Sequence, residues 1–150
     1  MKLITKPREH TAPVRYGAVS YWLTVACAVL LTAVVIAAGV LGLMVRADAQ
    51  IALGNAKAVR MALHTVSIER YGAGLPFADP SQAGGVPAEV YREVLHLSKA
   101  PGDLWLLQTG EDGYDVAKLI YTEGAFTVTY TADPASWVVD GQIELIHAVP

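Results

Sequence analysis

The longest hydrophobic stretch of the chain lies between Arg15 and Arg46, a window that contains no charged residue. An α-helix needs about 20 apolar residues to cross roughly 30 Å of hydrocarbon. Residues 16–45 are therefore long enough to span a bilayer with some tilt. Tyr21 and Trp22 lie near the N-terminal edge of this stretch, where amphipathic rings favour the membrane interface. We predict a single transmembrane helix over residues 16–45.

The pattern becomes amphipathic after Arg46. Residues 46–71 contain no proline, one glycine and many alanines, and alanine is the strongest helix former. The apolar positions recur at three- and four-residue steps, at Ala49, Ala52, Ala56, Val59, Leu63 and Val66. We predict that the transmembrane helix continues without a break through residues 46–71, and that this apolar stripe packs on a globular part formed by residues 72–150.

Residues 72–150 predict a short helix followed by a small sheet. Pro87 can open the helix at its first position. Its expected apolar face is Val90, Val94 and Leu97. From Asp103 the hydrophobic period changes to two, in the runs LWLLQT, YDVAKLIY, AFTVTYT, SWVVD and IELIHAV, which are separated by turn residues. The predicted class is α+β: a long N-terminal helix, transmembrane and then amphipathic, packed under an antiparallel β-meander of four or five strands with one short extra helix.

Charge is distributed unevenly along the chain. The first 46 residues carry five basic side chains and one acidic, a net charge of +4, and the remainder carries six basic and thirteen acidic, a net charge of −7. A basic flank before a membrane span stays in the cytoplasm. We therefore expect a cytoplasmic leader at residues 1–15, a single-pass anchor in the cell membrane and an extracytoplasmic C-terminal domain. The acidic domain argues against nucleic acid as a partner, since nucleic acid demands a basic patch.

The hydrophobic stretch could instead be a cleaved secretory signal. Residues 47–49, Ala-Asp-Ala, match the small-x-small pattern before a cut, which would place the mature start at Gln50. The hydrophobic region of a signal peptide has about 7–15 residues, and this one is roughly twice as long. Arg46 also interrupts the approach to the site. These two features favour an anchor over a conventional secretory signal.

Motifs that carry chemistry are sparse. No glycine-rich phosphate loop follows a predicted strand and no G-x-S-x-G is present, so we expect neither an enzymatic activity nor a cofactor. The four histidines are His10, His64, His96 and His147. They are far apart and none has a ligand partner three or four residues later, so we expect no metal site. The carboxylates of Glu111, Asp112 and Asp115 fit a solvated hairpin turn better than a calcium loop, whose full ligand spacing is missing.

Two segments carry a resemblance to a known family. Residues 55–74 contain an alanine-rich run, NAKAVRMAL, that leads to an aromatic residue and glycines, and residues 114–139 read YDVAKLIYTEGAFTVTYTADPASWVV. The first resembles the end of the long helix of type IV pilins and pseudopilins. The second is similar to the strands of pilin-like proteins from Gram-positive bacteria. The whole predicted architecture, a half-membrane helix under a small antiparallel sheet, also resembles that family.

The resemblance implies a processing site. Pilin precursors carry a basic leader that ends in glycine, which a prepilin peptidase removes; Gly17 matches that glycine, and Ala18 then becomes the first mature residue. The fifth mature residue is a glutamate in the family, thought to pair with the N-terminal amine of a neighbouring subunit. Here that residue is Trp22, so the prepilin signature is degenerate. Such a loss also occurs among tip-type minor pseudopilins.

The implied function is a pilin-like structural subunit, minor or accessory, of a type IV filament or a type II secretion-like apparatus. Its partners would be other pilin-like subunits or further copies of itself, assembled through the hydrophobic helix. Small residues let membrane helices approach closely. The candidates for this packing are Ala33, Ala37, Ala38, Gly39 and Gly42. The alternative function is a stand-alone, signal-anchored protein whose extracytoplasmic domain binds a partner.

Overall fold

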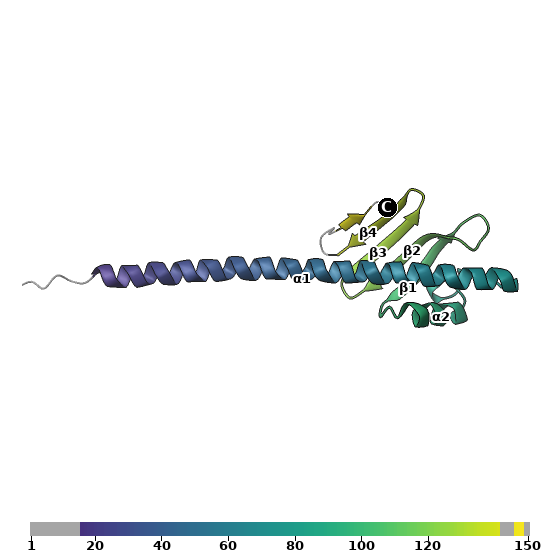
Figure 1. The fold of residues 1–150 in the computed structure, drawn as a ribbon, viewed down its shortest axis with the longest axis horizontal. Helices are drawn as coiled ribbons and strands as arrows, with labels where there is room; N and C mark the ends of the chain where they lie inside the picture. Colours follow the sequence, from purple (N-terminus) through teal and green to yellow (C-terminus); the bar gives the residue numbers. More distant parts are fainter. Residues whose placement is uncertain (1–15, 142–145, 149–150) are drawn as a thin grey trace, which may run out of the picture. The chain divides into compact units, whose positions relative to one another are not determined.

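The computed structural model describes residues 16–141 and 146–148 of the chain. Its elements are α1 (Tyr16–Ala73), the 3-10 turn η1 (Ala83–Gly85), α2 (Ala88–Ser98), β1 (Asp103–Thr109), β2 (Val116–Glu123), β3 (Phe126–Ala132), β4 (Ala135–Asp140) and β5 (Ile146–Ala148) (Figure 1). The predicted α+β class is confirmed. The chain divides into two compact units between Gly42 and Leu43. The predicted cytoplasmic leader, residues 1–15, lies outside the described residues.

The first unit contains the beginning of α1. A window of this helix has a mean hydropathy of 2.7, and no residue of the window is buried. The hydroxyls of Thr24 and Thr32 donate hydrogen bonds to the carbonyls of Ser20 and Ala28, four residues earlier, at 2.8 Å each. These polar groups are therefore satisfied inside the helix, as a hydrocarbon environment requires. Among the described residues, α1 is the one helix that is long and apolar enough to cross a membrane.

In the second unit, the amphipathic part of α1 packs on the sheet. The predicted apolar stripe is confirmed, because its six residues are between 0% and 1% exposed: Ala49, Ala52, Ala56, Val59, Leu63 and Val66. We call these six residues the buried stripe. They form one core cluster with side chains of the sheet, and Figure 1 shows α1 crossing the strands. The predicted packing of the amphipathic part of α1 on the sheet is therefore confirmed.

The sheet is a five-stranded antiparallel meander with the order β1-β2-β3-β4-β5, as the alternating runs predict. Two rows of directly paired residues face α1. One row is Leu106, Leu119, Tyr130 and Trp137, and the other is Leu104, Tyr121, Val128 and Val139. Each of these eight residues is at most 6% exposed. Alternate residues of a strand point to opposite faces of a sheet, which is why each row comes from every second position.

The short helix α2 differs from its prediction in two details. Pro87 is the residue before the helix, with φ −53° and ψ 145°, and the helix begins one residue later at Ala88. Val90 and Val94 are buried as expected, but Leu97 is 49% exposed, so its place on the apolar face is wrong. The inward face includes Tyr91 and Leu95 instead, which are partly buried against the core. With these residues facing inward, Leu97 points toward solvent.

The loop before α2 lies against the edge strand β1. Gly84 and Gly85 have φ values of +82° and +71°, which side chains rarely adopt. A β-carbon on Gly85 would collide with the carbonyl oxygen of Leu106 in β1. The two glycines thus allow the turn η1 to approach the edge of the sheet closely, and a covered edge is less prone to pair with another strand.

Candidate functional site

The predicted processing site lies in the first turn of α1. The helix begins at Tyr16, so the bond between Gly17 and Ala18 is already part of it. Gly17 is exposed, and no neighbouring atom would lie within 4 Å of a β-carbon at this position. Gly17 is therefore not covered by another described part of the chain. The assignment of Gly17 and Ala18 as a processing site stays a prediction.

The five small residues predicted for helix packing do not share one face of α1. Successive helical residues are about 100° apart, so Ala33 and Ala37 lie on one side while Ala38 and Gly42 lie roughly 140° away from them. All five are exposed, and Gly39 and Gly42 have no atom within 4 Å of a β-carbon position. The helix thus offers two small-residue faces, one with Ala33 and Ala37 and the other with Ala38, Gly39 and Gly42.

A polar connection joins α1 to the sheet. The Asn55 side-chain amide donates a hydrogen bond to Oε2 of Glu123 at 2.8 Å, and the hydroxyl of Tyr121 donates to the same oxygen at 2.8 Å. The backbone N–H of Gly102 donates to the Tyr121 oxygen at 3.0 Å. Burial raises the pKa of Tyr121 above its ordinary value, and the hydrogen bond to Glu123 raises it further. Within residues 16–141 and 146–148, each buried side-chain polar atom has a hydrogen-bond partner. The hydrogen bonds of Glu123 connect the helix to the sheet.

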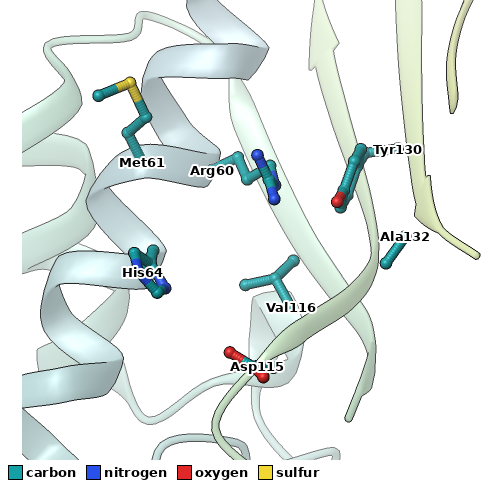
Figure 2. Close-up of a pocket in the computed structure, with 7 residues that line it drawn as sticks. All are labelled: Arg60, Met61, His64, Asp115, Val116, Tyr130 and Ala132. Carbon is teal, nitrogen blue, oxygen red and sulfur yellow. The ribbon is translucent and has the colours of Figure 1, made fainter. Parts of the chain in front are cut away.

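A cleft opens between α1 and strands β2 and β3. Its volume is about 310 Å³, and it is lined by Arg60, Met61, His64, Asp115, Val116, Tyr130 and Ala132 (Figure 2). The guanidinium carbon of Arg60 lies 4.4 Å from the centre of the Tyr130 ring, a cation–π contact. One turn away, Lys57 Nζ lies 6.0 Å from the centre of the Trp137 ring. The two cations stack on the aromatic side chains and cover one border of the core.

Two further titratable groups have shifted pKa values, and both shifts come from contacts that hold the fold. Burial raises the pKa of Tyr91, and its hydrogen bond to Asp103 adds to the rise. The pKa of Asp112 is lowered by the backbone N–H groups of Tyr114 and Asp115, which donate to its Oδ1. Asp112 therefore organises the turn between β1 and β2, as expected for a hairpin carboxylate.

The titratable side chains do not gather into a metal-like cluster. Within residues 16–141 and 146–148, no group of three His, Cys, Asp or Glu side chains could hold an ion. His64 lines the cleft, His96 is exposed on α2, and His10 lies outside the described residues. The expectations of no metal, no cofactor and no enzymatic activity stay predictions.

Comparison of the chain with models of protein families, with characterised proteins and with solved structures gives no match. The functional argument therefore depends on the chain's own features. One apolar helix near the N-terminus, joined to a small sheet domain, is compatible with a single-pass membrane protein. Most of the exposed large hydrophobic side chains among the described residues lie on that helix, and they are the candidate functional site.

Proposed function

We propose that this protein is a pilin-like structural subunit, minor or accessory, of a type IV filament or a type II secretion-like apparatus. One observation carries the proposal. A single helix, α1, is apolar and unburied in its first part and then supplies the core stripe of a small antiparallel domain. Such a helix would anchor its domain to the membrane before assembly, and it would offer neighbouring subunits an apolar packing surface afterwards.

Assembly follows from the hydrophobicity of the first part of α1. Large side chains such as Leu30, Val34 and Ile36 are 60–66% exposed, so lipid or a neighbouring helix has to cover them. Each Å² of apolar surface left in water costs about 25 cal/mol. A subunit that leaves the bilayer must therefore pack this helix against other apolar helices. The small-residue faces of α1 would permit close approach on two sides.

The residue at the fifth mature position supports an accessory role. Trp22 is 69% exposed and takes the place of the family's glutamate. A tryptophan carries no charge with which to pair a neighbouring N-terminal amine. The subunit would therefore enter an assembly by apolar packing alone. A position at the tip of a filament would suit it, because a tip subunit has a neighbouring subunit on one side only.

The proposal is tested by recovery of the assembled material. A C-terminally tagged chain should co-purify with sheared surface filaments or with other pilin-like subunits. A Gly17→Leu variant should keep its leader, because a bulky side chain replaces the open glycine at the cut, and a Gly39→Leu variant should be processed normally. The proposal fails if the tagged chain stays a free membrane monomer in the same amount whether or not the filament machinery is present.

The cleft beside α1 supports a second candidate function, a stand-alone anchored protein whose extracytoplasmic domain binds a partner. Arg60, His64 and Asp115 place a cation, an imidazole and a carboxylate around one opening of the domain (Figure 2). Such an anchored protein needs no leader peptidase. An intact Met1 in the mature protein would favour this function over the pilin-like one.

A further inference from the structure

The cleft beside α1 has a buried floor and polar, exposed walls. Val116 and Tyr130 form the floor and are 9% and 4% exposed, whereas Arg60, His64 and Asp115 on the walls are exposed. The volume of about 310 Å³ is at the lower end of the range for ligand pockets, about 300–1,000 Å³. The cleft therefore suits a ligand of few atoms.

The Tyr130 hydroxyl is an unused polar group at the floor of the cleft. The hydroxyls of three other tyrosines of the domain donate hydrogen bonds within the chain: Tyr91, Tyr114 and Tyr121. That of Tyr130 forms no hydrogen bond with any residue that the structure describes, although the side chain is almost completely buried. Figure 2 shows its oxygen pointing into the cleft. Because the hydroxyl groups of buried residues are normally hydrogen-bonded, this one is available to a group that enters the cleft.

Arg60 presents further donors to the same space. Its guanidinium carbon lies 4.4 Å from the centre of the Tyr130 ring, so the ring covers one face of the planar group. The five N–H donors of a guanidinium lie in its plane, where they match the two oxygens of a carboxylate. Within the described part of the chain, the guanidinium of Arg60 forms no ion pair, since the one ion pair joins Arg70 to Glu89. Arg60 and Tyr130 can therefore donate together to one carboxylate.

Asp115 brings the opposite charge to the cleft without contacting Arg60. The two side chains line the same opening, yet they form no ion pair in the structure. A simple anion that reached Arg60 would be repelled by Asp115, and a simple cation at Asp115 would be repelled by Arg60. A ligand that carries both charges is attracted at both ends. The charges of the cleft are therefore complementary to a zwitterion.

We propose that this cleft binds a small zwitterion of the amino-acid or short-peptide class. The ligand's carboxylate accepts hydrogen bonds from the Arg60 guanidinium and the Tyr130 hydroxyl, and its ammonium donates to the Asp115 carboxylate. Its apolar part contacts Val116 and Ala132, which also line the cleft. The side chains of α1, β2 and β3 thus meet in one recognition site.

The inference rests on the second candidate function, an anchored domain that binds a partner, and it names the chemistry of that partner. It does not require a filament. Binding is measured on the purified chain, whereas filament assembly is measured by co-purification and the anchored state by the mature N-terminus. The zwitterion site can therefore fail while either function stands, and the reverse.

Calorimetric titration of the full-length chain in a non-ionic detergent tests the site. The zwitterionic probes are L-alanine and L-alanyl-L-alanine. Their controls are N-acetyl-alanyl-alanine, which lacks the ammonium, and alanyl-alanine amide, which lacks the carboxylate. At least one zwitterion should bind about tenfold more tightly than either blocked peptide, and the tighter of the two identifies a free amino acid or a peptide as the ligand. No saturable binding of either zwitterion, or equal affinity for a blocked peptide, would overturn the inference.

Tyr130→Phe tests the contribution of the hydroxyl, because it keeps the ring that packs in the core and under Arg60. It should weaken binding of the zwitterion by about tenfold, with unchanged near-UV circular dichroism. Tyr91→Phe is the matched control, since the Tyr91 hydroxyl donates to Asp103 and lines no part of the cleft. Equal affinities of the two variants would overturn the role of the Tyr130 hydroxyl in the site.

Asp115→Asn distinguishes recognition of a zwitterion from attraction of any anion. The variant keeps the shape of the side chain and removes its charge. It should weaken binding of the zwitterion by about tenfold and strengthen binding of N-acetyl-alanyl-alanine. Asp140→Asn, at an exposed residue of β4 outside the cleft, should change neither affinity. Equal effects of the two variants, or a change of the same sign for both ligands in Asp115→Asn, would overturn the inference.

Discussion

The dependence of the sheet domain on α1 can be tested by shortening one side chain of the buried stripe. Leu63 is 0% exposed and is among the largest fully buried side chains of the domain. It belongs to the core cluster that α1 shares with the sheet. Leu63→Ala keeps the helix intact, since alanine is the better helix former. Any loss of stability therefore reports the packing of α1 on the sheet.

The magnitude follows from the atoms removed. Leu63→Ala deletes three buried carbons, each worth about 0.8 kcal/mol of transfer free energy, or roughly 2.4 kcal/mol together. The cavity left between the helix and the strands adds to this, so the free energy of unfolding should fall by about 2–5 kcal/mol. Small domains have about 5–15 kcal/mol in total. The substitution should remove a large share of the domain's stability.

Leu97→Ala is the matched control, because it deletes the same atoms from a residue that is 49% exposed. About half of the transfer free energy is then lost, and solvent fills the space, so the loss should be about 1 kcal/mol or less. The two variants remove the same atoms, so the difference between their losses of unfolding free energy measures the effect of burial against the sheet.

Urea unfolding of the full-length chain in detergent micelles, followed by near-UV circular dichroism, measures both variants. Detergent keeps the apolar part of α1 helical, so the transition reports the domain. With a slope of about 1–3 kcal/mol per M urea, the Leu63→Ala midpoint should fall by on the order of 1–2 M. A loss below about 1 kcal/mol, or equal losses for Leu63→Ala and Leu97→Ala, would refute the assignment of α1 as the spine of the domain.

Three further predictions concern titration and topology. Because the pKa of Tyr121 is raised in the folded state, the protonated side chain contributes fully to stability below the ordinary pKa of 10.0, and this contribution is lost as the pH rises through the folded-state pKa. Glu123→Gln should lower the pKa of Tyr121 in a spectrophotometric titration. An unchanged titration would contradict the hydrogen bond between Tyr121 and Glu123. The hydrogen bonds that lower the pKa of Asp112 stabilise the fold above the ordinary pKa of 3.8, and this stabilisation is lost as the pH falls through the folded-state pKa. Asp112→Ala should therefore make the free energy of unfolding less dependent on pH in this acid range. An identical acid transition in the variant would argue against this role of Asp112. Glu69→Cys in a Cys27→Ala background should react with a membrane-impermeant maleimide added to intact cells, whereas labelling only after lysis would reverse the predicted orientation.

Features that depend on local periodicity could be predicted from the sequence. The buried stripe from Ala49 to Val66 follows from three- and four-residue steps alone, and a meander of four or five strands follows from alternation between turns. Regular spacing encodes which face of an element is apolar, without knowledge of what covers it.

The choice between two apolar faces could not be predicted. The run LWLL in β1 is apolar at four successive positions, and the structure buries Leu104 and Leu106 while leaving Trp105 40% and Leu107 52% exposed. Either alternate set could have faced the core. α1 covers one face of the sheet, and that packing decides between them. The error at Leu97 has the same cause, because the neighbours of α2 determine which of its apolar residues lie inward.

Contacts between distant segments also carried no sequence signal. Asn55 and Glu123 are 68 residues apart, and only the placement of α1 on the sheet brings the amide to the carboxylate. The cleft beside α1 likewise combines residues of the helix with residues of β2 and β3. The predicted processing residues, Gly17 and Ala18, are the opposite case, because the prediction depends on a short local motif, and the structure adds only that Gly17 is exposed.

The mass of the mature N-terminus tests the pilin-like function most directly. Intact-mass and peptide mass spectrometry of the tagged protein, isolated from its own cell envelope, locates the first residue. The account predicts a start at Ala18, with Gly17 and the basic leader removed. An intact Met1 would contradict prepilin-type processing and favour the stand-alone anchored protein, and a start at Gln50 would contradict both by releasing the domain from the membrane.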